Sequence, residues 1–429
     1  MVKAILKEIL LEHREKIDKS QKEGFVVREK LEQIKGFVKV KQAIIITGVR
    51  RCGKSVFLSQ IINKFFRKCY YINFEDERLA DFELKDFNVL YETCIELFDK
   101  NKTFFLDEVQ NIPGWERWVR RMYDDNFKFF ITGSNAKLLS KELATLLTGR
   151  HLQFTVFPFS FREVLDFYKV NVKKNDIYLT EKRAIILRYF SGYLKSGGFP
   201  EFLKYKKIEI LQEYFNSIIE RDIVERYNIS GVRQIKEMGR YLITNTGNLM
   251  TYGKLKKFTE IKSVNTVIKY LSYLENAYLI FKVPYFSYSL KKQMANPFKV
   301  YCIDAGLRNA VSFSFSGDFG RIYETVVAIE LRRRNKDIYY WKNPQQEEVD
   351  FVIKRGQKIE QLIQVCYDLK DIDTKKREIR SLIKASRELA CNTLLVLTQD
   401  YEAEEKTDWF DIRRKIKFVP LWKWLLIIS

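Results

Sequence analysis

The stretch AIIITGVRRCGKSVFL, Ala43 to Leu58, decides the fold of this chain. Its apolar, β-branched run breaks at Gly48, and a helical pattern resumes after Ser55, so the stretch predicts a strand, a loop and a helix. Gly48 and Gly53 bracket four residues and are followed by Lys54 and Ser55, which is the spacing of a phosphate-binding P-loop. Glycine lets the backbone turn its N–H groups inward around a phosphate, where a Cβ atom would collide. We therefore predict that this loop binds a nucleoside triphosphate.

The residues of the loop have distinct chemical roles. Lys54 supplies positive charge to the β- and γ-phosphates, the Ser55 hydroxyl is a Mg²⁺ ligand, and the start of the following helix adds a partial positive charge. The chain has no NKxD motif of the kind that reads guanine, which favours ATP over GTP. The residues that we expect to contact the nucleotide are Gly48, Arg51, Cys52, Gly53, Lys54, Ser55 and Val56.

A second strand, TFFLDEVQNI, ends in the carboxylates Asp107 and Glu108. An apolar run followed by two acids is the Walker B pattern, and in a parallel sheet its end converges with the end of the P-loop strand. We expect Asp107 to hold Mg²⁺ and Glu108 to polarise the attacking water. A strand end with two solvated acids is the alternative, and the neighbouring P-loop argues against it.

Two further side chains are candidates for catalysis. The strand FKFFITGSNAKLL ends in Ser134 and Asn135, and a polar side chain there would sense the γ-phosphate or the water, although such residues also make turns and helix caps. The next helix ends at Arg150, which would complete a neighbouring subunit's site as an arginine finger or serve as a helix-end cation. We therefore predict a catalytic set of Lys54, Glu108, Asn135 and Arg150.

The composition points to an anionic partner. The chain has 429 residues and a net charge of +21, from 76 basic and 55 acidic residues. This balance favours nucleic acid, and a lysine-rich proteome is the alternative explanation. Six cysteines without CxxC spacing and two histidines disfavour a zinc site and favour a reduced, cytoplasmic protein. No apolar run reaches membrane-spanning length, so we expect a soluble protein with no membrane partner.

Successive blocks of the sequence lie in the order of a known family: GVRRCGKS, FFLDEVQNIPGWERWVRRMYD, ITGSNAKLLSKELATLLTGR, FPFSFREVL, YLKSGGFPEF, NPFKVYCIDAGLRNAV and EEVDFVI. In these blocks the chain resembles the AAA-type (AAA+) ATPases of archaea and bacteria that carry a C-terminal nuclease-like domain of poorly known function. The resemblance implies an α/β fold with a P-loop AAA+ core, a helical lid, a winged helix and a restriction-endonuclease-like end. The expected boundaries are 1–157, 158–227, 228–312 and 313–429.

The expected winged helix supports a DNA-binding hypothesis. Three helical segments end in SVNTVIKYLSYLENAYLI, where we expect Val264, Val267, Ile268, Leu271 and Leu274 to face the core and Lys262, Asn265, Thr266 and Lys269 to be exposed. This is the geometry of a recognition helix in a major groove, with IFKVPYFSYSLKKQ as the wing. Phosphate contacts would come from Lys254, Lys256, Lys257, Lys291 and Lys292. A winged helix that only packs against protein is the alternative.

The last predicted domain departs from the nuclease pattern. The resemblance implies a helix with Glu324 and Glu330, an acidic position at Asp350 and a Glu-x-Lys triplet on the next strand. This chain has Gln364, Val365 and Cys366 at the triplet, so a metal ligand and an ammonium group are both missing there. Glu348 and Glu360 do not occupy the expected places. We therefore expect no hydrolysis by this domain.

The function that these observations favour is ATP hydrolysis with Mg²⁺, coupled to the remodelling of DNA or of a protein partner by a homo-oligomer. Two alternatives remain open. One is an ATP-gated DNA-binding module with negligible turnover, and the other is an ATP-assisted nuclease.

Overall fold

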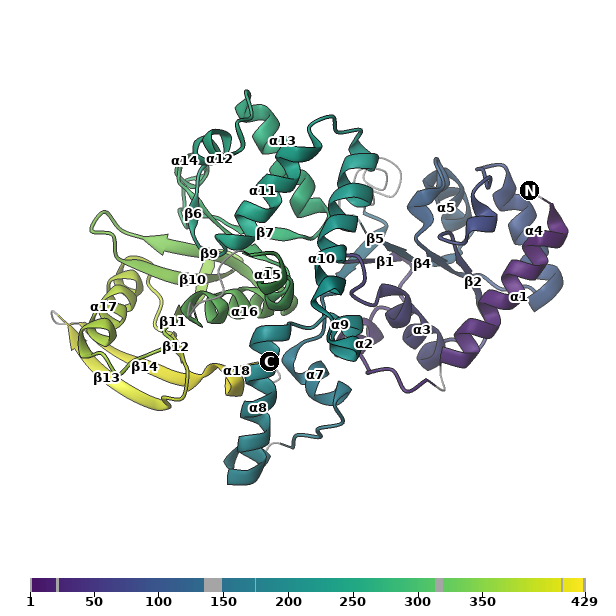
Figure 1. Cartoon of the computed structure of the whole chain (residues 1–429). Coiled ribbons are helices and arrows are strands. Elements are labelled where there is room, and N and C mark those ends of the chain that lie inside the picture. Colours follow the sequence, from purple (N-terminus) through teal and green to yellow (C-terminus); the bar gives the residue numbers. More distant parts are fainter. Residues whose placement is uncertain are drawn as a thin grey trace. The chain divides into compact units, whose positions relative to one another are not determined.

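The computed structural model describes residues 2–20, 23–134, 149–173, 175–312, 319–409 and 412–426 (Figure 1). The chain divides into two compact units. The first unit comprises Met1–Phe157 and Asn276–Tyr278, and the second comprises Pro158–Glu275 and Leu279–Ser429. Within the described residues, no helix is both long enough and apolar enough to cross a membrane.

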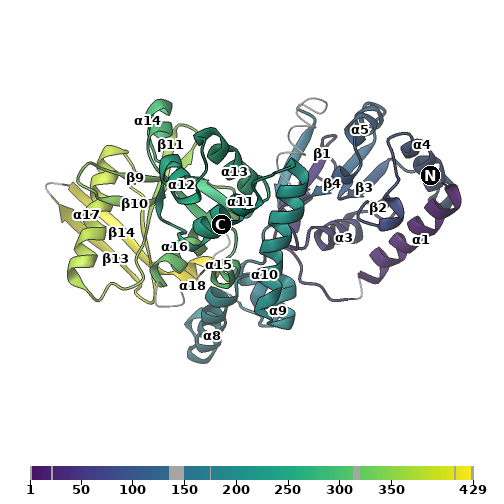
Figure 2. The ribbon, with the colours of Figure 1, turned by 45° about the horizontal axis from the view of Figure 1, so that its top comes forward.

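The first unit contains a five-stranded parallel sheet in the order β2-β3-β4-β1-β5, and Figure 2 shows β1, β4, β3 and β2 in this sequence across the sheet. Its strands are β1 (Ala43–Thr47), β2 (Tyr70–Asn73), β3 (Thr103–Asp107), β4 (Lys128–Gly133) and β5 (His151–Thr155). Its helices are α1 (Lys3–Ser20), α2 (Lys30–Lys35), α3 (Lys54–Phe65), α4 (Asp86–Phe98) and α5 (Trp115–Asp124). The predicted α/β fold with a parallel P-loop sheet is confirmed.

The core of this unit explains its apolar strands. All five residues of β1 are buried, because a parallel strand covered on both faces needs apolar side chains on each. Ile45 belongs to a cluster with side chains of α1, α4 and α5, which includes Trp115 and Trp118. Residues on the opposite face include Phe105 and Phe130, whose rings stack with centroids 4.5 Å apart. This packing on both faces of the sheet holds the strand ends, and the polar residues that follow them, in fixed positions.

The first part of the second unit is mostly helical and ends in a small sheet of order β6-β8-β7. Its helices before that sheet are α7 (Phe161–Phe167), α8 (Thr180–Ser196), α9 (Pro200–Tyr205), α10 (Ile208–Ser217) and a π-helical segment, Ile218–Glu225. There follow α11 (Val232–Thr244), β6 (Leu249–Met250), α12 (Tyr252–Thr259), α13 (Val264–Asn276), β7 (Ile280–Val283), α14 (Leu290–Ala295), β8 (Phe298–Cys302) and α15 (Ala305–Val311). The winged-helix assignment of this region stays a prediction.

One prediction about α13 is wrong. Val267, Leu271 and Leu274 are fully buried, as expected, but Val264 and Ile268 are 41% and 40% exposed. The helix turns a narrower face to the core than the apolar spacing suggested. Val264 and Ile268 thus lie on the surface beside the exposed Asn265 and Lys269.

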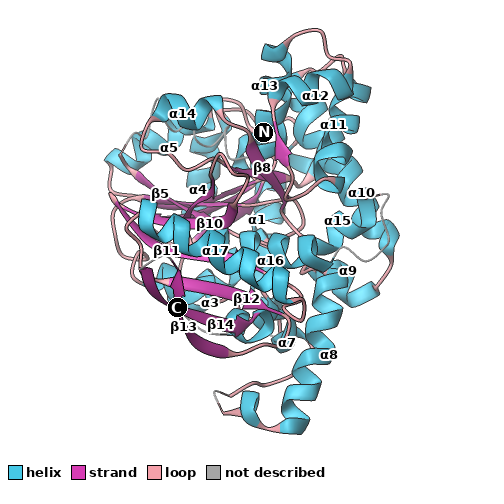
Figure 3. Ribbon diagram, turned by 90° about the vertical axis from the view of Figure 1, so that its left-hand side faces the viewer, coloured by secondary structure: helices cyan, strands magenta, loops and turns pink. Residues whose placement is uncertain are grey.

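The C-terminal part of the second unit is a mixed six-stranded sheet in the order β13-β14-β12-β11-β10-β9. Figure 3 labels its strands β10 to β14. Its elements are α16 (Phe319–Arg333), β9 (Asp337–Lys342), β10 (Glu348–Arg355), β11 (Lys358–Val365), α17 (Ile372–Glu388), β12 (Leu394–Thr398), β13 (Ala403–Trp409), β14 (Ile412–Pro420) and α18 (Leu421–Leu426). β9, β10 and β11 are antiparallel neighbours, and β12 returns parallel to β11. α17 packs on the sheet with Leu382 against Val352 and Leu362 in one core. The restriction-endonuclease-like assignment stays a prediction.

Candidate active site

The loop after β1 has the tight geometry that its glycines predict. Gly48 has a φ of +150°, and a Cβ atom there would lie 2.1 Å from the carbonyl oxygen of Val156. Gly53 has a φ of +94° and directly precedes α3. Any other residue at Gly48 would collide with the backbone after β5, and at Gly53 it would be strained. The loop therefore depends on both glycines.

Hydrogen bonds from Arg28 and from Cys52 fix the loop against the backbone that follows β5. Arg28, which is 4% exposed, donates from Nη1 to the Cys52 carbonyl at 3.2 Å and from Nη2 to the Phe157 carbonyl. The Cys52 thiol donates to the Val156 carbonyl at 3.3 Å, and burial raises the pKa of this thiol. Cys52 is therefore an uncharged packing group of the loop. Arg51, with a φ of +66°, and Val56 lie at the outer edge of the loop and in the first turn of α3.

Lys54 and Glu108 form a buried ion pair. Lys54 is the first residue of α3 and Glu108 follows β3, and their Nζ and Oε1 atoms are 3.3 Å apart. The side chains are only 5% and 8% exposed. Lys54 Nζ also lies 3.5 Å from the Val49 carbonyl. The structure thus brings together the two residues to which the sequence assigns phosphate binding and water activation.

Asp107 lies beside this pair at the end of β3 and is fully buried. Thr132, in β4, donates its hydroxyl to Asp107 Oδ1, and Tyr71, in β2, donates to Oδ2 at 3.1 Å. Burial and the nearby Glu108 charge raise the pKa of Asp107 to about 6, although hydrogen bonds from Thr132 and Ser55 and the Lys54 charge oppose the shift. The link between Ser55 and Asp107 places the two predicted Mg²⁺ ligands together, and both offer the hard oxygen atoms that Mg²⁺ requires.

Glu108 is held by its backbone as well as by Lys54. Its φ of +51° is in the left-handed region, which is rare for residues other than glycine and is common at functional positions. Its N–H donates to the Thr132 hydroxyl at 2.9 Å, and its carboxylate accepts from the Gln110 amide. Burial works to raise the pKa of Glu108, but the Lys54 charge and the Gln110 hydrogen bond outweigh it and leave the pKa lowered.

The remaining two predicted catalytic residues are not part of this cluster. Asn135 lies outside the described residues, whereas Ser134 is buried directly after β4. Arg150 immediately precedes β5, pairs with Asp124 at 2.8 Å and lies over the Tyr123 ring at 5.6 Å from its centroid. The structure therefore gives Arg150 partners within its own chain.

Sequence reasoning missed Tyr71, Thr132 and Arg28. Each acts through a contact between segments that are distant in sequence: Asp107 is 36 positions after Tyr71, and Cys52 is 24 positions after Arg28. Thr132 carried a weak signal, since it is a polar residue near the end of a strand next to β3 in the sheet. The sequence around Arg28 contains no pattern that would have predicted its contact with the loop.

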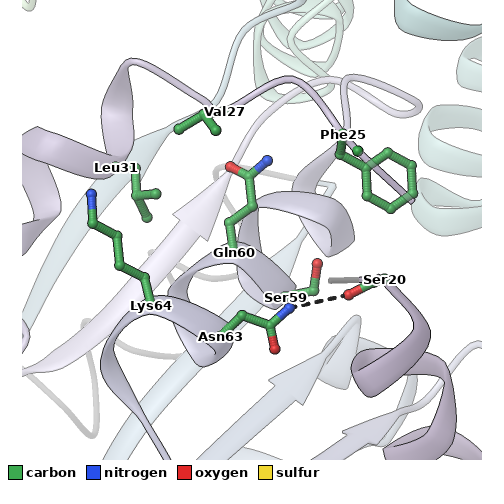
Figure 4. Close-up of a pocket in the computed structure, with 9 residues that line it drawn as sticks. Ser20, Phe25, Val27, Leu31, Ser59, Gln60, Asn63 and Lys64 are labelled. Carbon is green, nitrogen blue, oxygen red and sulfur yellow. Dashed lines mark hydrogen bonds between the residues drawn. The ribbon is translucent and has the colours of Figure 1, made fainter. Parts of the chain in front are cut away.

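A cavity of about 330 Å³ lies along the later turns of α3 (Figure 4). It is lined by Ser20, Gly24, Phe25, Val27, Leu31, Ser59, Gln60, Asn63 and Lys64. The Gln60 amide fixes one wall, because it donates to the Val26 carbonyl at 2.7 Å and accepts from the Arg28 N–H at 3.1 Å. The lining combines apolar and amide groups, as small-molecule pockets do.

Comparisons with known proteins agree with this geometry. The family described as "AAA domain" matches residues 40–165, and two domains of unknown function, DUF8612 and DUF4143, match residues 187–317 and 319–424. An uncharacterized protein of Methanocaldococcus jannaschii is 42% identical over 397 residues, which cover 89% of this chain and 88% of that protein. An uncharacterized protein of Haemophilus influenzae is 30% identical over 340 residues, which cover 76% and 82%.

Solved structures give weaker matches. AMPPCP-bound DnaA of Aquifex aeolicus is 15% identical with a TM-score of 0.25, covering 58% of this chain and 89% of that chain. The RuvB Holliday junction branch migration motor of Thermotoga maritima is 15% identical with a TM-score of 0.30, covering 64% and 89%. Because its relatives match over most of their length and an AAA domain covers the P-loop sheet, the chain belongs to the family of AAA-type P-loop ATPases whose C-terminal domain has no known function.

Proposed function

We propose that this protein hydrolyses ATP with Mg²⁺ and couples the reaction to a change in bound DNA. The observation that supports hydrolysis most directly is the buried pair of Lys54 and Glu108, 3.3 Å apart, with Asp107 beside them. A protein that only bound nucleotide would need the lysine and the metal ligand. It would not need a second buried carboxylate next to them.

The residues divide the chemistry between them. Lys54 moves from Glu108 to the phosphate oxygens, and Glu108, released from the ammonium, accepts a proton from the attacking water. The ion pair keeps Glu108 a weak base until the phosphates draw Lys54 away, because the Lys54 charge lowers the pKa of that carboxylate. Ser55 and Asp107 would hold Mg²⁺, which neutralises charge on the β- and γ-phosphates when it is bound.

The test of hydrolysis compares three variants by phosphate release and by binding of a fluorescent ATP analogue. Lys54→Ala should lose both, and Glu108→Gln should keep binding and lose release. Lys68→Ala is the matched control, since Lys68 lies just after the same helix and pairs with Asp99 on the surface, outside the cavity. Equal phosphate release by the parent and Glu108→Gln would support the ATP-gated binding module instead.

We assign the cavity along α3 to the nucleoside part of ATP. The helix that begins with Lys54 supplies Ser59, Gln60 and Asn63 to the wall of the cavity. One ATP molecule would therefore place its phosphates at the start of this helix and its base along the later turns. Phe25→Ala should weaken ATP binding and leave tripolyphosphate binding unchanged. Equal losses for both ligands would remove this assignment.

The proposal for DNA rests on exposed cations of the second unit. The net charge of the chain is +21, and the lysines predicted to contact phosphates in α12 and α14 are all exposed: Lys254, Lys256, Lys257, Lys291 and Lys292. ATP turnover measured with and without double-stranded and single-stranded DNA tests the coupling. Binding should fall steeply with salt because neutralised phosphates release counterions. A protein that is not retained on DNA at low salt would contradict the proposal.

We propose that the active form is a homo-oligomer in which Arg150 completes the site of a neighbouring subunit. To do so, Arg150 must exchange Asp124 for phosphate. Glu108→Gln subunits keep the arginine, and Arg150→Ala subunits keep the base, so mixing the two inactive proteins should restore part of the turnover. No recovery on mixing, with both variants folded, would assign Arg150 to the Asp124 contact alone.

A further inference from the structure

A buried cluster of opposite charges joins the small sheet to the six-stranded sheet within the second unit. Lys299, on β8, has a side chain that is 3% exposed. Its Nζ atom lies 2.7 Å from Glu324 Oε1, 2.6 Å from Glu348 Oε1 and 3.0 Å from Asp350 Oδ1. Glu324 comes from α16, and the other two carboxylates come from β10. An ammonium group has three hydrogens to donate, so these three contacts use all of them.

The carboxylates of this cluster have further partners. The Tyr301 hydroxyl donates to Glu324 Oε1 at 2.6 Å, and the Val365 N–H donates to Asp350 Oδ2 at 3.0 Å. Lys342 Nζ lies 3.6 Å from Glu348 Oε2. Each carboxylate is thus fixed by a second hydrogen-bond donor or cation in addition to Lys299. Groups from β8, β9, β10 and β11 all converge here.

The positions expected to complete a nuclease triplet are engaged in other contacts. The side-chain oxygen Oε1 of Gln364 accepts from the Asp350 backbone N–H at 3.2 Å, and the side-chain nitrogen Nε2 of Gln364 donates to the Glu378 carboxylate. A glutamate at this position would place a second carboxylate against Glu378. Cys366 donates to the Asp368 carbonyl at 3.3 Å. Neither side chain is directed to a shared metal position with Asp350.

These residues do not fit a divalent cation. A catalytic metal needs carboxylate oxygens that converge on an accessible position, and here an ammonium group stands where the three carboxylates converge. Within the part of the chain that the structure describes, no group of three or more His, Cys, Asp or Glu side chains is arranged to hold a metal ion. We propose that Lys299 is the built-in cation of this cluster and that the C-terminal domain works without a divalent metal.

The consequence concerns how the two domains of unknown function depend on each other. Lys299 lies in the segment matched at residues 187–317, and its three carboxylates lie in the segment matched at residues 319–424. The ammonium group that pairs with the carboxylates of the second segment is therefore supplied by the first. This shared ion cluster joins them into one unit, in which the carboxylates are not available for nucleic-acid cleavage.

The test measures Mn²⁺ bound to the nucleotide-free full chain by electron paramagnetic resonance. All proteins carry Asp107→Asn, which removes the proposed metal ligand of the P-loop site. In this background we expect no Asp350-dependent Mn²⁺ binding. Adding Lys299→Met should create one bound Mn²⁺ per chain, and adding Asp350→Asn to that protein should abolish it. Lys342→Met is the matched control and should create no site.

Two results would overturn the proposal. One is Mn²⁺ binding by the Asp107→Asn protein that falls when Asp350→Asn is added, since it would show a native metal site. The other is a Lys299→Met protein with native circular dichroism that binds no Mn²⁺. If the Lys299→Met protein does not fold, the test rests on the Asp107→Asn protein with and without Asp350→Asn. Equal Mn²⁺ binding by these two proteins supports the built-in cation. The P-loop proposal is unaffected by either result.

Discussion

Two lysines of this protein are buried against carboxylates, but their surroundings differ. Lys54 is 5% exposed and stands at the start of a helix, after a glycine loop, 3.3 Å from Glu108. Lys299 is 3% exposed and lies within strand β8, with three carboxylate oxygens at 2.6 to 3.0 Å. A loop can rearrange around a new anion, whereas two packed sheets cannot. The first ion pair is therefore built to exchange its partner, and the second is built to keep it.

The largest expected effect is on stability and comes from Lys299→Met. Removing one partner from a buried ion pair leaves uncompensated charge and costs about 3–5 kcal/mol, and here three carboxylates lose their cation. Urea unfolding should show a loss of this size, with Lys342→Met, whose side chain is 24% exposed, losing about 1 kcal/mol or less. Equal losses for the two variants would contradict a special role for Lys299.

Lys54→Ala should affect turnover instead. Losing a preorganised charge at the reacting phosphates costs about 10²–10³-fold in rate, and phosphate release by the parent and the variant at the same ATP concentration measures the loss. The unfolding free energy should fall by less than for Lys299→Met, because Gln110 still donates to Glu108. If Lys54→Ala destabilised the protein as strongly as Lys299→Met, the contrast between an exchangeable and a permanent ion pair would be lost.

The third prediction concerns pH and Asp107. Its folded pKa is raised to about 6 from an ordinary value of 3.8, so its contribution to stability is complete below the unfolded pKa and is lost as the pH rises through about 6. At pH 7.5 the ionised carboxylate therefore destabilises the nucleotide-free protein by about 3 kcal/mol, at about 1.4 kcal/mol for each pKa unit. Asp107→Asn should raise the unfolding free energy at pH 7.5 and lessen its increase between pH 7.5 and 5.

The outcome that would contradict this sign is a parent protein that gains stability relative to Asp107→Asn as the pH rises from 5 to 7.5. The measurement is urea unfolding at several pH values without nucleotide or divalent metal. Phosphate release by the same variant should be lost, since the amide replaces a proposed Mg²⁺ ligand. A more stable but inactive protein is the expected combination for a residue that serves function at the expense of the fold.

The same contrast explains what the sequence could predict. Gly48, Gly53, Lys54 and Ser55 lie within eight residues, so local spacing was enough to identify the loop, and the apolar runs were enough to identify strands of a parallel sheet. Lys299 lies in the apolar run FKVYC, which reveals an unusual buried lysine but not its partners, because they come from α16 and β10. Ion pairs between distant elements depend on packing that no local pattern contains.

The error at Val264 and Ile268 has a related cause. Apolar spacing along α13 shows which residues lie on one face, but the width of the buried face depends on how far the neighbouring helices extend. Asp107 and Glu108 were recognisable because the strand end and the acids are adjacent in sequence. The Tyr71 and Thr132 hydroxyls that fix Asp107 come from the neighbouring strands β2 and β4, and only the folded sheet brings them together.

The smallest expected effect belongs to exposed lysines, which form a third class beside the two buried ones. Lys256 and Lys257 on α12 are exposed, so replacing both with alanine should leave stability and DNA-free ATP turnover nearly unchanged. If each contacts a phosphate, the slope of log affinity for DNA against log salt should decrease by about 2, because each lysine accounts for about 1. Lys16→Ala with Lys19→Ala, on exposed positions of α1 in the first unit, is the matched control and should leave the slope unchanged. A slope that both double variants reduce equally would indicate general attraction to a basic protein, whereas a loss confined to α12 would place DNA on the second unit.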